Sequence, residues 1–367
     1  MTARSRADTD DRPRDTEIAR PGRTVRARAP LRLGLAGGGT DLSPYCDEFG
    51  GAVLNCTIDR YAYCFIEPSP DDDIHFVAHD LGVQESVPRH ALALGGVRLP
   101  IHAGVYRRMM TQYGGDALPA LRVSSYVDAP PGSGLGSSSA LVVAMVEAFR
   151  TLLALPLGLY DVAHLAFEIE RIDLRLAGGK QDQYAAAFGG ANFIEFLAGD
   201  RVIVNPLRVT RGFMNELETS LVTCFTGLSR HSDAIIEEQQ RHMALADRAA
   251  LDSLHQLKRD AVEMKQALLR GEIRHVAEIL NRSWSAKKRT ARSVSNRHIE
   301  ELYEAAMDHG AIAGKVSGAG GGGFFMFIVP PQNRVKLIRS LNQMQATASA
   351  VHFTGEGAES WVTEGFD

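Results

Sequence analysis

The segment that most constrains this chain is a glycine- and serine-rich stretch, PPGSGLGSSSA, at residues 130–140. A strand-like run at residues 121–127 leads into it, and a helix-like apolar run at residues 140–149 leads out. The prolines end the strand because they offer no N–H, and the glycines remove Cβ atoms that would keep an anion from the backbone. We expect the serines to cap the helix, whose first N–H groups lack partners within the helix. The context therefore predicts a phosphate-binding loop rather than a flexible turn.

This loop differs from the common P-loop, which ends in Gly-Lys-Ser/Thr, because no lysine lies between Arg122 and Arg150. Phosphate charge would be met by backbone N–H groups, serine hydroxyls and a metal ion. A second pattern, Gly318, Gly320 and Gly323, fits G-x-G-x-x-G by letter. It leads into an apolar strand rather than a helix, so it is not a dinucleotide fingerprint. We expect a tight turn that lies against the ligand.

Composition excludes several classes of protein. The 367 residues suffice for two domains, and 45% hydrophobic with 23% charged residues is typical of a soluble globular protein. A net charge of −4 gives no general attraction to nucleic acid or anionic membranes, and no apolar run approaches a membrane span. The four cysteines form no C-x-x-C pair. We expect a cytoplasmic protein with a small-molecule partner, and a homo-oligomer is compatible with the sequence.

Two further segments place polar groups after strand-like or glycine-rich runs. Residues 28–41 alternate leucines around Arg32 and then turn through three glycines, which would bring Thr40 and Asp41 to a ligand. Asp41 could alternatively cap the next helix. A glycine pair at residues 178–179 places Lys180 and Asp182 at the start of a short helix. An acid at the start of a helix often only complements the helix dipole, and a catalytic role for Asp182 is an equal alternative.

The other expected elements follow from apolar periodicity. We expect strands at 52–58, 61–66, 191–196 and 220–225, and helices at 101–112, 160–176, 232–266, 273–280 and 299–308. A basic segment such as 281–296 is most often a solvated helix face. The arginine-rich and aspartate-rich residues 1–26 have almost nothing to bury and predict a mobile tail.

Three glycine-rich stretches, at residues 28–41, 130–140 and 315–323, resemble those of the GHMP kinases, the superfamily of galactokinase, homoserine kinase and mevalonate kinase. The serine run in place of Gly-Lys-Thr is the most specific of them. The resemblance implies an α+β fold of two domains with the active site between them. Residues 27–206 would form the N-terminal ATP-binding domain, similar to ribosomal S5 domain 2, and residues 207–367 a ferredoxin-like C-terminal domain.

Residues 36–41, 168–171, 178–184 and 284–288 resemble the branch that phosphorylates D-glycero-α-D-manno-heptose 7-phosphate. The resemblance implies a sugar 1-kinase that uses ATP and Mg²⁺ to phosphorylate the anomeric hydroxyl and gives the 1,7-bisphosphate. Its product would feed GDP-heptose synthesis for capsule or other surface polysaccharide. Two alternatives stay open. One is another GHMP sugar kinase, acting on galactose, fucose or a related sugar, and the other is a non-catalytic nucleotide-binding regulator.

The resemblance also implies roles for individual residues. Ser138 and Glu170 would hold Mg²⁺, which prefers hard oxygen ligands. Asp182 would act as general base or orient the sugar hydroxyl, with Arg32 paired to it and Lys180 sharing the duty of Arg32. The ATP phosphates would be cradled by Pro131, Gly132, Ser133, Gly134, Leu135, Gly136, Ser137, Ser138 and Ser139. The sugar phosphate would be bound by Gly38, Gly39, Thr40, Asp41, Asp182, Gly318, Gly320, Lys287 and Lys288, with Arg289 and Arg60 as further candidates for its phosphate.

Overall fold

The computed structural model describes residues 23–89, 96–114, 119–229, 232–244 and 247–364. Residues 1–22 of the predicted tail lie outside the described residues. Residues 23–26 begin the first strand, β1 (Arg23–Ala36), so the tail prediction is wrong for them. No helix among the described residues is long and apolar enough to cross a membrane.

Eight strands form one mixed sheet. Besides β1, they are β2 (Gly51–Pro68), β3 (Asp73–Ala78), β4 (Val83–Pro88), β5 (Leu121–Val127), β6 (Ala191–Leu197), β7 (Arg201–Pro206) and β12 (Glu359–Glu364). The order is β12-β1-β2-β5-β3-β4, and β6 and β7 continue from the first half of β2. Neighbours are antiparallel except β3 and β5, which are parallel.

The two strands expected at 52–58 and 61–66 are one continuous strand, β2. Its first half pairs with β6 and its second half with β5, so β2 changes partner near the polar residues Asp59 and Arg60 instead of ending there. A register shift against β1 between Pro30 and Arg32 lies close to this change. The polar pair therefore marks an exchange of neighbours in a long strand, which local sequence does not distinguish from a turn.

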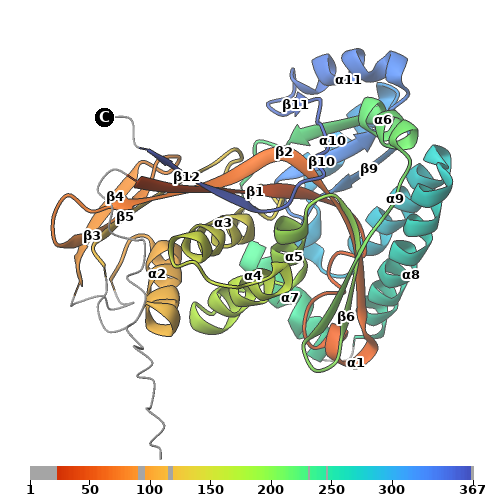
Figure 1. Cartoon of the computed structure of the whole chain (residues 1–367). Helices are drawn as coiled ribbons and strands as arrows, with labels where there is room; N and C mark the ends of the chain where they lie inside the picture. The colour runs from red at the N-terminus through yellow and green to blue at the C-terminus, as the bar shows by residue number, and fades with distance from the viewer. Residues whose placement is uncertain (1–22, 90–95, 115–118, 230–231, 245–246, 365–367) are drawn as a thin grey trace, which may run out of the picture.

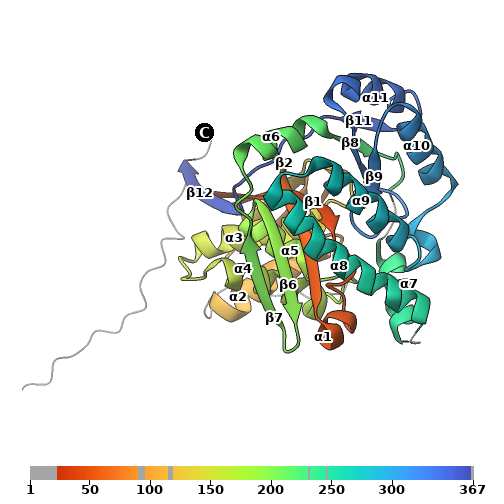
Figure 2. The same ribbon diagram turned by 90° about the vertical axis from the view of Figure 1, so that its right-hand side faces the viewer.

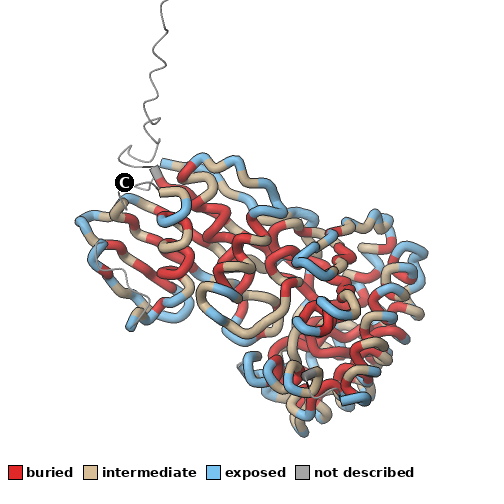
Figure 3. The backbone as a smooth tube through the Cα atoms, turned by 90° about the horizontal axis from the view of Figure 1, so that it is seen from below, coloured by how far each residue is buried: buried red, intermediate tan, exposed pale blue. Residues whose placement is uncertain are grey.

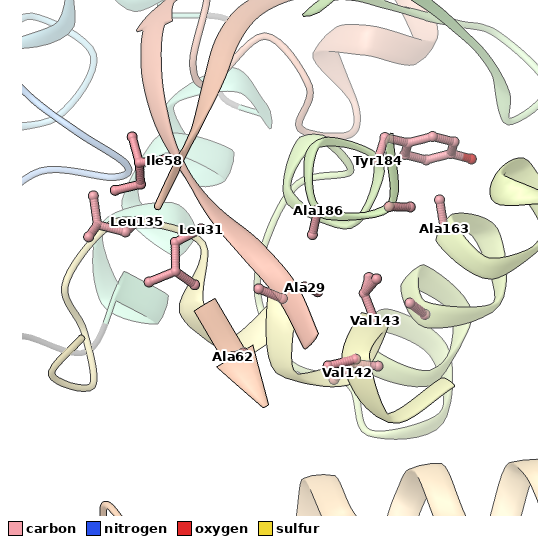
Figure 4. Packing of buried hydrophobic residues seen from close by; sticks show 14 of the residues in the cluster. Ala29, Leu31, Ile58, Ala62, Leu135, Val142, Val143, Ala163, Tyr184 and Ala186 are labelled. Atoms are coloured by element: carbon pink, nitrogen blue, oxygen red, sulfur yellow. The ribbon is translucent and has the colours of Figure 1, made fainter. Parts of the chain in front are cut away.

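Four helices cover one face of this sheet (Figure 1): α2 (Pro100–Tyr113), α3 (Ser137–Leu152), α4 (Leu159–Glu168) and α5 (Gln181–Phe188). Figure 4 shows part of the core, where the apolar faces of α3, α4 and α5 meet β1 and β2. The buried side chains labelled there include Ala29, Leu31, Ala62, Leu135, Val142, Val143, Ala163 and Ala186. This packing fixes the start of α3 and the start of α5 relative to β1.

A second, antiparallel sheet has the order β11-β8-β10-β9. Its strands are β8 (Leu221–Phe225), β9 (Ala313–Val316), β10 (Phe324–Ile328) and β11 (Thr347–Ser349), accompanied by α10 (Arg297–Asp308) and α11 (Arg334–Leu341). Apolar side chains from this sheet and from α10 and α11 form a second hydrophobic cluster. The helix α6 (Arg211–Ser220) and the strand β7 were not expected from the sequence.

The helix expected at 232–266 is two helices, α7 (Ser232–Ala244) and α8 (Arg248–Arg270). Asp247 begins α8, because its carboxylate accepts the N–H groups of Ala249 and Ala250. The next helix, α9 (Ile273–Lys287), is longer than the expected 273–280 and ends within the basic segment. Figure 2 shows α8 and α9 side by side, and both contact β1.

The two halves of the chain share structure. The predicted boundary at residues 206–207 falls between β7 and α6, yet β12 returns to pair with β1. Buried residues of α8 and α9, such as Met264 and Leu280, belong to the same hydrophobic cluster as Leu33. Figure 3 shows buried segments running through both parts of the molecule. These contacts hold the segments from the two halves against one another where the cleft forms.

Candidate active site

A cleft of about 330 Å³ lies where the glycine-rich segments converge. It is lined by the loop between β5 and α3, the loop between β9 and β10, the segment after β1, and the start of α5. Residues of α7 and the end of α9 close another side. The three glycine-rich stretches, which are far apart in the sequence, therefore meet at one cavity together with the start of α5.

The loop between β5 and α3 turns through glycines in the left-handed region: φ is 70° at Gly132, 73° at Gly134 and 75° at Gly136. Gly136 is the N-cap residue of α3, and no described side chain caps the helix, so the predicted capping by serine is wrong. A left-handed N-cap suits glycine, because it lacks the Cβ that makes this conformation costly. The serines instead occupy the first turn, where Ser137, Ser138 and Ser139 line the cleft. The helix N-terminus thus faces the cavity.

Not every residue of the loop faces the cleft. The side chains of Ser133 and Leu135 are fully buried, and Pro131 is exposed outside the cavity lining. The backbone oxygen of Ser133 accepts the N–H of Phe324 at 2.8 Å. Direct contact of these three side chains with a phosphate is therefore not supported by the structure, whereas the three glycines and three serines line the cleft.

The loop between β9 and β10 packs directly on the loop between β5 and α3. A Cβ at Gly318 would lie 2.7 Å from the carbonyl oxygen of Gly134, so only glycine allows this approach. Gly318 and Gly320 both line the cleft, with φ of 74° and 105°. The turn expected between two strands therefore lies beside the loop that is predicted to bind phosphate, and both line the cleft.

An ion pair crosses the cleft floor between β1 and α5. The guanidinium of Arg32 donates from Nε to Oδ1 of Asp182 at 2.7 Å, and its Nη2 lies 2.6 Å from the same oxygen. Nη1 donates to the carbonyl oxygen of Gly134 at 2.6 Å and to the hydroxyl of Ser317 at 3.3 Å. Arg32 is only 4% exposed, whereas the Asp182 side chain retains 21% exposure. Asp182 is therefore bound by a buried arginine and remains accessible from the cavity.

Asp41 lies beside this pair and lines the cleft. Its carboxylate accepts the backbone N–H groups of Gly39 and Gln181, both at 3.2 Å, and the Gln181 side-chain amide at 3.1 Å. The alternative that Asp41 caps the following helix is wrong, because Pro44 is the N-cap residue of α1 (Tyr45–Phe49). The prediction that the neighbouring Thr40 contacts the ligand is wrong. Its buried hydroxyl is bonded instead to the backbone oxygens of Gly37 and Ala52.

Glycine at position 179 is required by the carboxylate of Asp41. A Cβ there would lie 1.9 Å from Oδ2 of Asp41, so Gly179→Ala forces the carboxylate or the loop to move. We expect the free energy of unfolding to fall by roughly 1–3 kcal/mol, as for other overpacked sites. Urea denaturation measures it. Gly212→Ala in α6 is the control, because nothing lies within 4 Å of its Cβ position; equal losses in both variants would contradict the prediction.

Glu170 lines the same cleft as the ion pair. The helix expected at 160–176 changes after α4 to a π-helical turn, Ile169–Asp173, which lets consecutive side chains point inward. Ile169 is buried in the core, while Glu170, 1% exposed, lines the cleft. The hydroxyl of Ser138 donates to Oε1 of Glu170 at 3.2 Å. Such π-turns occur frequently at functional sites.

This pair of oxygen ligands fits a magnesium ion. The structure describes no group of three or more His, Cys, Asp or Glu side chains that could hold a metal by themselves. Mg²⁺ is commonly bound through one or two carboxylates together with substrate phosphates, and it keeps several waters. Ser138 and Glu170 face the same cavity as the phosphate-binding loop, so the donor set matches that mode of binding.

Lys287 is the predicted phosphate ligand that the structure brings to the cleft. It ends α9 and is 2% exposed, and its amine donates to the carbonyl oxygen of Gly38 at 3.3 Å. Burial, partly offset by Asp41, lowers the pKa of Lys287 to about 8. The amine lies among Arg32, Asp41 and Asp182 without an ion-pair partner of its own among the described contacts.

The other predicted cations are engaged elsewhere. Lys288 donates to the carboxylate of Glu300, at 3.1 and 3.2 Å. Arg289 donates to the carbonyl oxygen of Ser285, and Arg60 donates to the hydroxyl of Ser349. None of the three is among the described residues that line the cleft. The structure therefore corrects the prediction that Lys288, Arg289 and Arg60 bind the substrate.

The prediction that Lys180 shares the duty of Arg32 is also corrected. Its amine lies 2.5 Å from Oδ1 of Asp200 and 3.8 Å from Oδ1 of Asp47. Burial alone would lower the pKa of Lys180, but the hydrogen bond to Asp200 and the nearby acidic groups, Asp200 and Asp47 among them, together outweigh it and raise the pKa above its ordinary value. Lys180 is thus a buried ion-pair residue that lies outside the described lining of the cleft.

Several lining residues were not found from the sequence. Asp233, Ile236 and Gln239 come from α7, and Arg171 follows Glu170 in the π-turn. The helix α7 carried no motif, so nothing local indicated that one face of it would meet the cleft. Arg171 could have been found, because it adjoins a predicted metal ligand within a stretch already singled out.

Comparisons with known proteins identify the family of this chain. The family GHMP kinases N terminal domain matches residues 100–190, and GHMP kinases C terminal matches residues 264–346. The chain is 44% identical to the D-glycero-alpha-D-manno-heptose 7-phosphate kinase of Campylobacter jejuni, over 92% of this chain and 99% of that protein. The chain therefore belongs to the GHMP kinases. It is an ATP-dependent phosphotransferase that acts on a hydroxyl group.

Solved structures extend the comparison. A D-glycero-D-manno-heptose 1-phosphate kinase from Bacteroides thetaiotaomicron is 42% identical and superposes with a TM-score of 0.78, covering 92% of this chain and 98% of that one. The structure of Lactococcus lactis galactokinase complexed with galactose is 17% identical and superposes with a TM-score of 0.71. The match covers 92% of this chain and 95% of that one, and it shows a shared fold. The predicted family and its two-domain α+β fold are confirmed.

Proposed function

We propose that this chain transfers the γ-phosphoryl group of ATP to the anomeric hydroxyl of D-glycero-α-D-manno-heptose 7-phosphate. One observation carries the proposal. The Arg32–Asp182 ion pair and the Ser138–Glu170 pair line one cleft, in a chain 44% identical to a heptose 7-phosphate kinase. The first pair suits the acceptor hydroxyl, and the second suits the phosphates of the donor.

The donor side consists of the loop between β5 and α3. Its backbone N–H groups and the first turn of α3 would receive the phosphates, because an unsatisfied helix start attracts anions. Ser138 and Glu170 would hold Mg²⁺, which when bound offsets phosphate charge. The close contact of Gly318 with Gly134 keeps the two loops together at this position.

The acceptor side consists of Asp182, Arg32, Asp41 and Lys287. Asp182 would accept a hydrogen bond from the anomeric hydroxyl and receive its proton during transfer. The transition state of phosphoryl transfer is loose, so orientation of that oxygen is the main requirement on the side chain. Arg32 holds Asp182 in place and adds positive charge beside the transferring group. Asp41 and Lys287 would bind other oxygens of the sugar phosphate.

The product, a 1,7-bisphosphate, would supply GDP-heptose synthesis for surface polysaccharide, with the kinase acting in the cytoplasm. The names of the two similar proteins place the phosphate differently, at position 7 of the substrate in one and at position 1 in the other. Both names are compatible with one reaction if position 1 is where the phosphate is added. The test must therefore determine both the substrate and the position phosphorylated.

The experiment is a coupled ADP-release assay over sugars and sugar phosphates with ATP and Mg²⁺, followed by NMR of the product. We expect turnover of heptose 7-phosphate and a new phosphate on the anomeric carbon. Turnover of galactose or fucose without turnover of heptose 7-phosphate would assign a different sugar kinase. ATP binding without turnover of any sugar would favour a regulator and contradict the proposal.

A further inference from the structure

The first turn of α5 carries two adjacent polar side chains that reach different parts of the site. Asp182 points to Arg32, and the next residue, Gln183, points to Glu170. The Gln183 side chain is fully buried. Its amide nitrogen lies 2.5 Å from Oε2 of Glu170 and 3.1 Å from the hydroxyl of Ser139. One helical turn thus contacts both halves of the cleft.

The contacts of Glu170 divide between its two oxygens. Oε1 accepts the hydroxyl of Ser138 and lies 3.8 Å from Nη1 of Arg171. Oε2 accepts the amide of Gln183. Because the carboxylate is 1% exposed, a protein donor rather than solvent holds Oε2. The amide of Gln183 therefore sets the rotation of the carboxylate plane and leaves Oε1 on the side of Ser138 and the cleft.

The remaining atom of the amide, Oε1 of Gln183, is buried without a hydrogen-bond partner among the described residues. An unpaired buried oxygen costs about 1–3 kcal/mol. The amide is therefore not favourable for packing alone, and its donor group makes the contacts to Glu170 and Ser139. A thioether such as methionine would fill similar space without the donor.

We propose that Gln183 is a positioning residue that holds the Glu170 carboxylate in the orientation required for magnesium binding. This inference rests on the proposed function, which places Mg²⁺ at Ser138 and Glu170. It assigns Gln183 a role distinct from that of Asp182: Asp182 acts on the acceptor hydroxyl, and Gln183 acts through Glu170 on the donor phosphates. The rigid first turn of α5 keeps the two in a fixed relation.

The test is Gln183→Met, with metal binding as the measurement. We expect the free Mg²⁺ concentration at half-maximal rate to rise roughly 10- to 100-fold, as for other residues that orient a metal ligand. The KM for heptose 7-phosphate should change less than about twofold, because Gln183 does not line the acceptor side. Binding of Mn²⁺ with a non-hydrolysable ATP analogue, followed by electron paramagnetic resonance, should weaken by a similar factor without any turnover.

Asn192→Leu is the matched control. Asn192 is also a fully buried amide, donates to the carbonyl oxygen of Gly189 at 2.8 Å, and leaves its own Oδ1 unpartnered among the described atoms. We expect it to lose thermal stability comparably and to leave the Mg²⁺ and Mn²⁺ dependence unchanged. If Gln183→Met does not fold, Gln183→Leu also removes the donor without adding charge, and the same weakening of Mn²⁺ binding is expected.

Glu170→Gln separates the two levels of the proposal. If it leaves Mn²⁺ binding unchanged, the metal site in the proposed function is wrong. If Glu170→Gln weakens Mn²⁺ binding and Gln183→Met does not, the inference about Gln183 is overturned while the metal site stands. Weakening in both variants, with none in Asn192→Leu, supports it.

Discussion

Asp182→Asn is expected to lower kcat by roughly 10²- to 10⁴-fold, the usual effect of removing a positioned acid–base group. The carboxylate is bound to Arg32 at 2.6–2.7 Å and faces the cleft. Asparagine keeps the size and one acceptor oxygen, but it cannot receive the proton of the anomeric hydroxyl. The KM for ATP should stay within a few-fold, because the donor loop is untouched.

Steady-state kinetics with heptose 7-phosphate measure the effect, and the onset of unfolding shows whether the variant is intact. Arg32 loses its charged partner in a site where it is 4% exposed, so we also expect a lower Tm. Asp200→Asn is the control. Asp200 forms the ion pair with Lys180 outside the cleft lining, and its loss should leave kcat nearly unchanged. Asp182→Asn with near full kcat would rule out the assignment.

Lys287→Met is expected to raise the KM for heptose 7-phosphate about 10- to 150-fold, the effect of losing a charge-assisted hydrogen bond of about 1.5–3 kcal/mol. Lys287 is buried at the cleft, whereas its neighbour Lys288 is bound to Glu300 outside it. Lys288→Met is therefore a control that removes the same charge from the next position. Equal effects of the two substitutions, or an equal rise in the KM for ATP, would contradict this role.

The same lysine predicts a pH dependence. Its pKa is lowered to about 8 by burial, so the charged form predominates below pH 8 and is lost as the pH rises through this value. We expect kcat/KM for heptose 7-phosphate to fall above about pH 8 in the wild type. Lys287→Arg should remove that fall, because arginine keeps its charge. A fall that persists in Lys287→Arg would assign it to another group. Buried Lys315, whose pKa is lowered by burial and by Lys287 to about 7, would instead give a change near pH 7.

Local sequence was sufficient for elements whose signals are short-ranged. The strand before the loop and the start of α5 lie where apolar periodicity and glycines placed them, whereas α3 begins at Ser137, ahead of the predicted run at 140–149. It was not sufficient where partners decide the outcome. The strand β2 runs through Asp59 because β5 and β6 pair with its two halves, and neither partner is visible from residues 51–68.

The candidate site shows the same division. Arg32 and Asp182 were named from motifs 150 residues apart, and the fold brings them to hydrogen-bond distance. Lys287 and Lys288 were indistinguishable as neighbours in a basic segment, since which of them faces the cleft depends on how α9 is rotated against β1. Lys180 was predicted beside Asp182, but Asp200 from a later loop binds its amine.

The sequence by itself determined the chemistry available to this protein: a glycine–serine loop for phosphates, an arginine, three carboxylates and a basic segment. That information is local, because glycine conformations and helix starts depend on residues a few places apart. The tertiary structure decided which of these groups share the cleft. Only packing of α5 and α9 against β1 fixes the directions of Gln183 and Lys287, and side-chain direction is a property of neighbours that are distant in the chain.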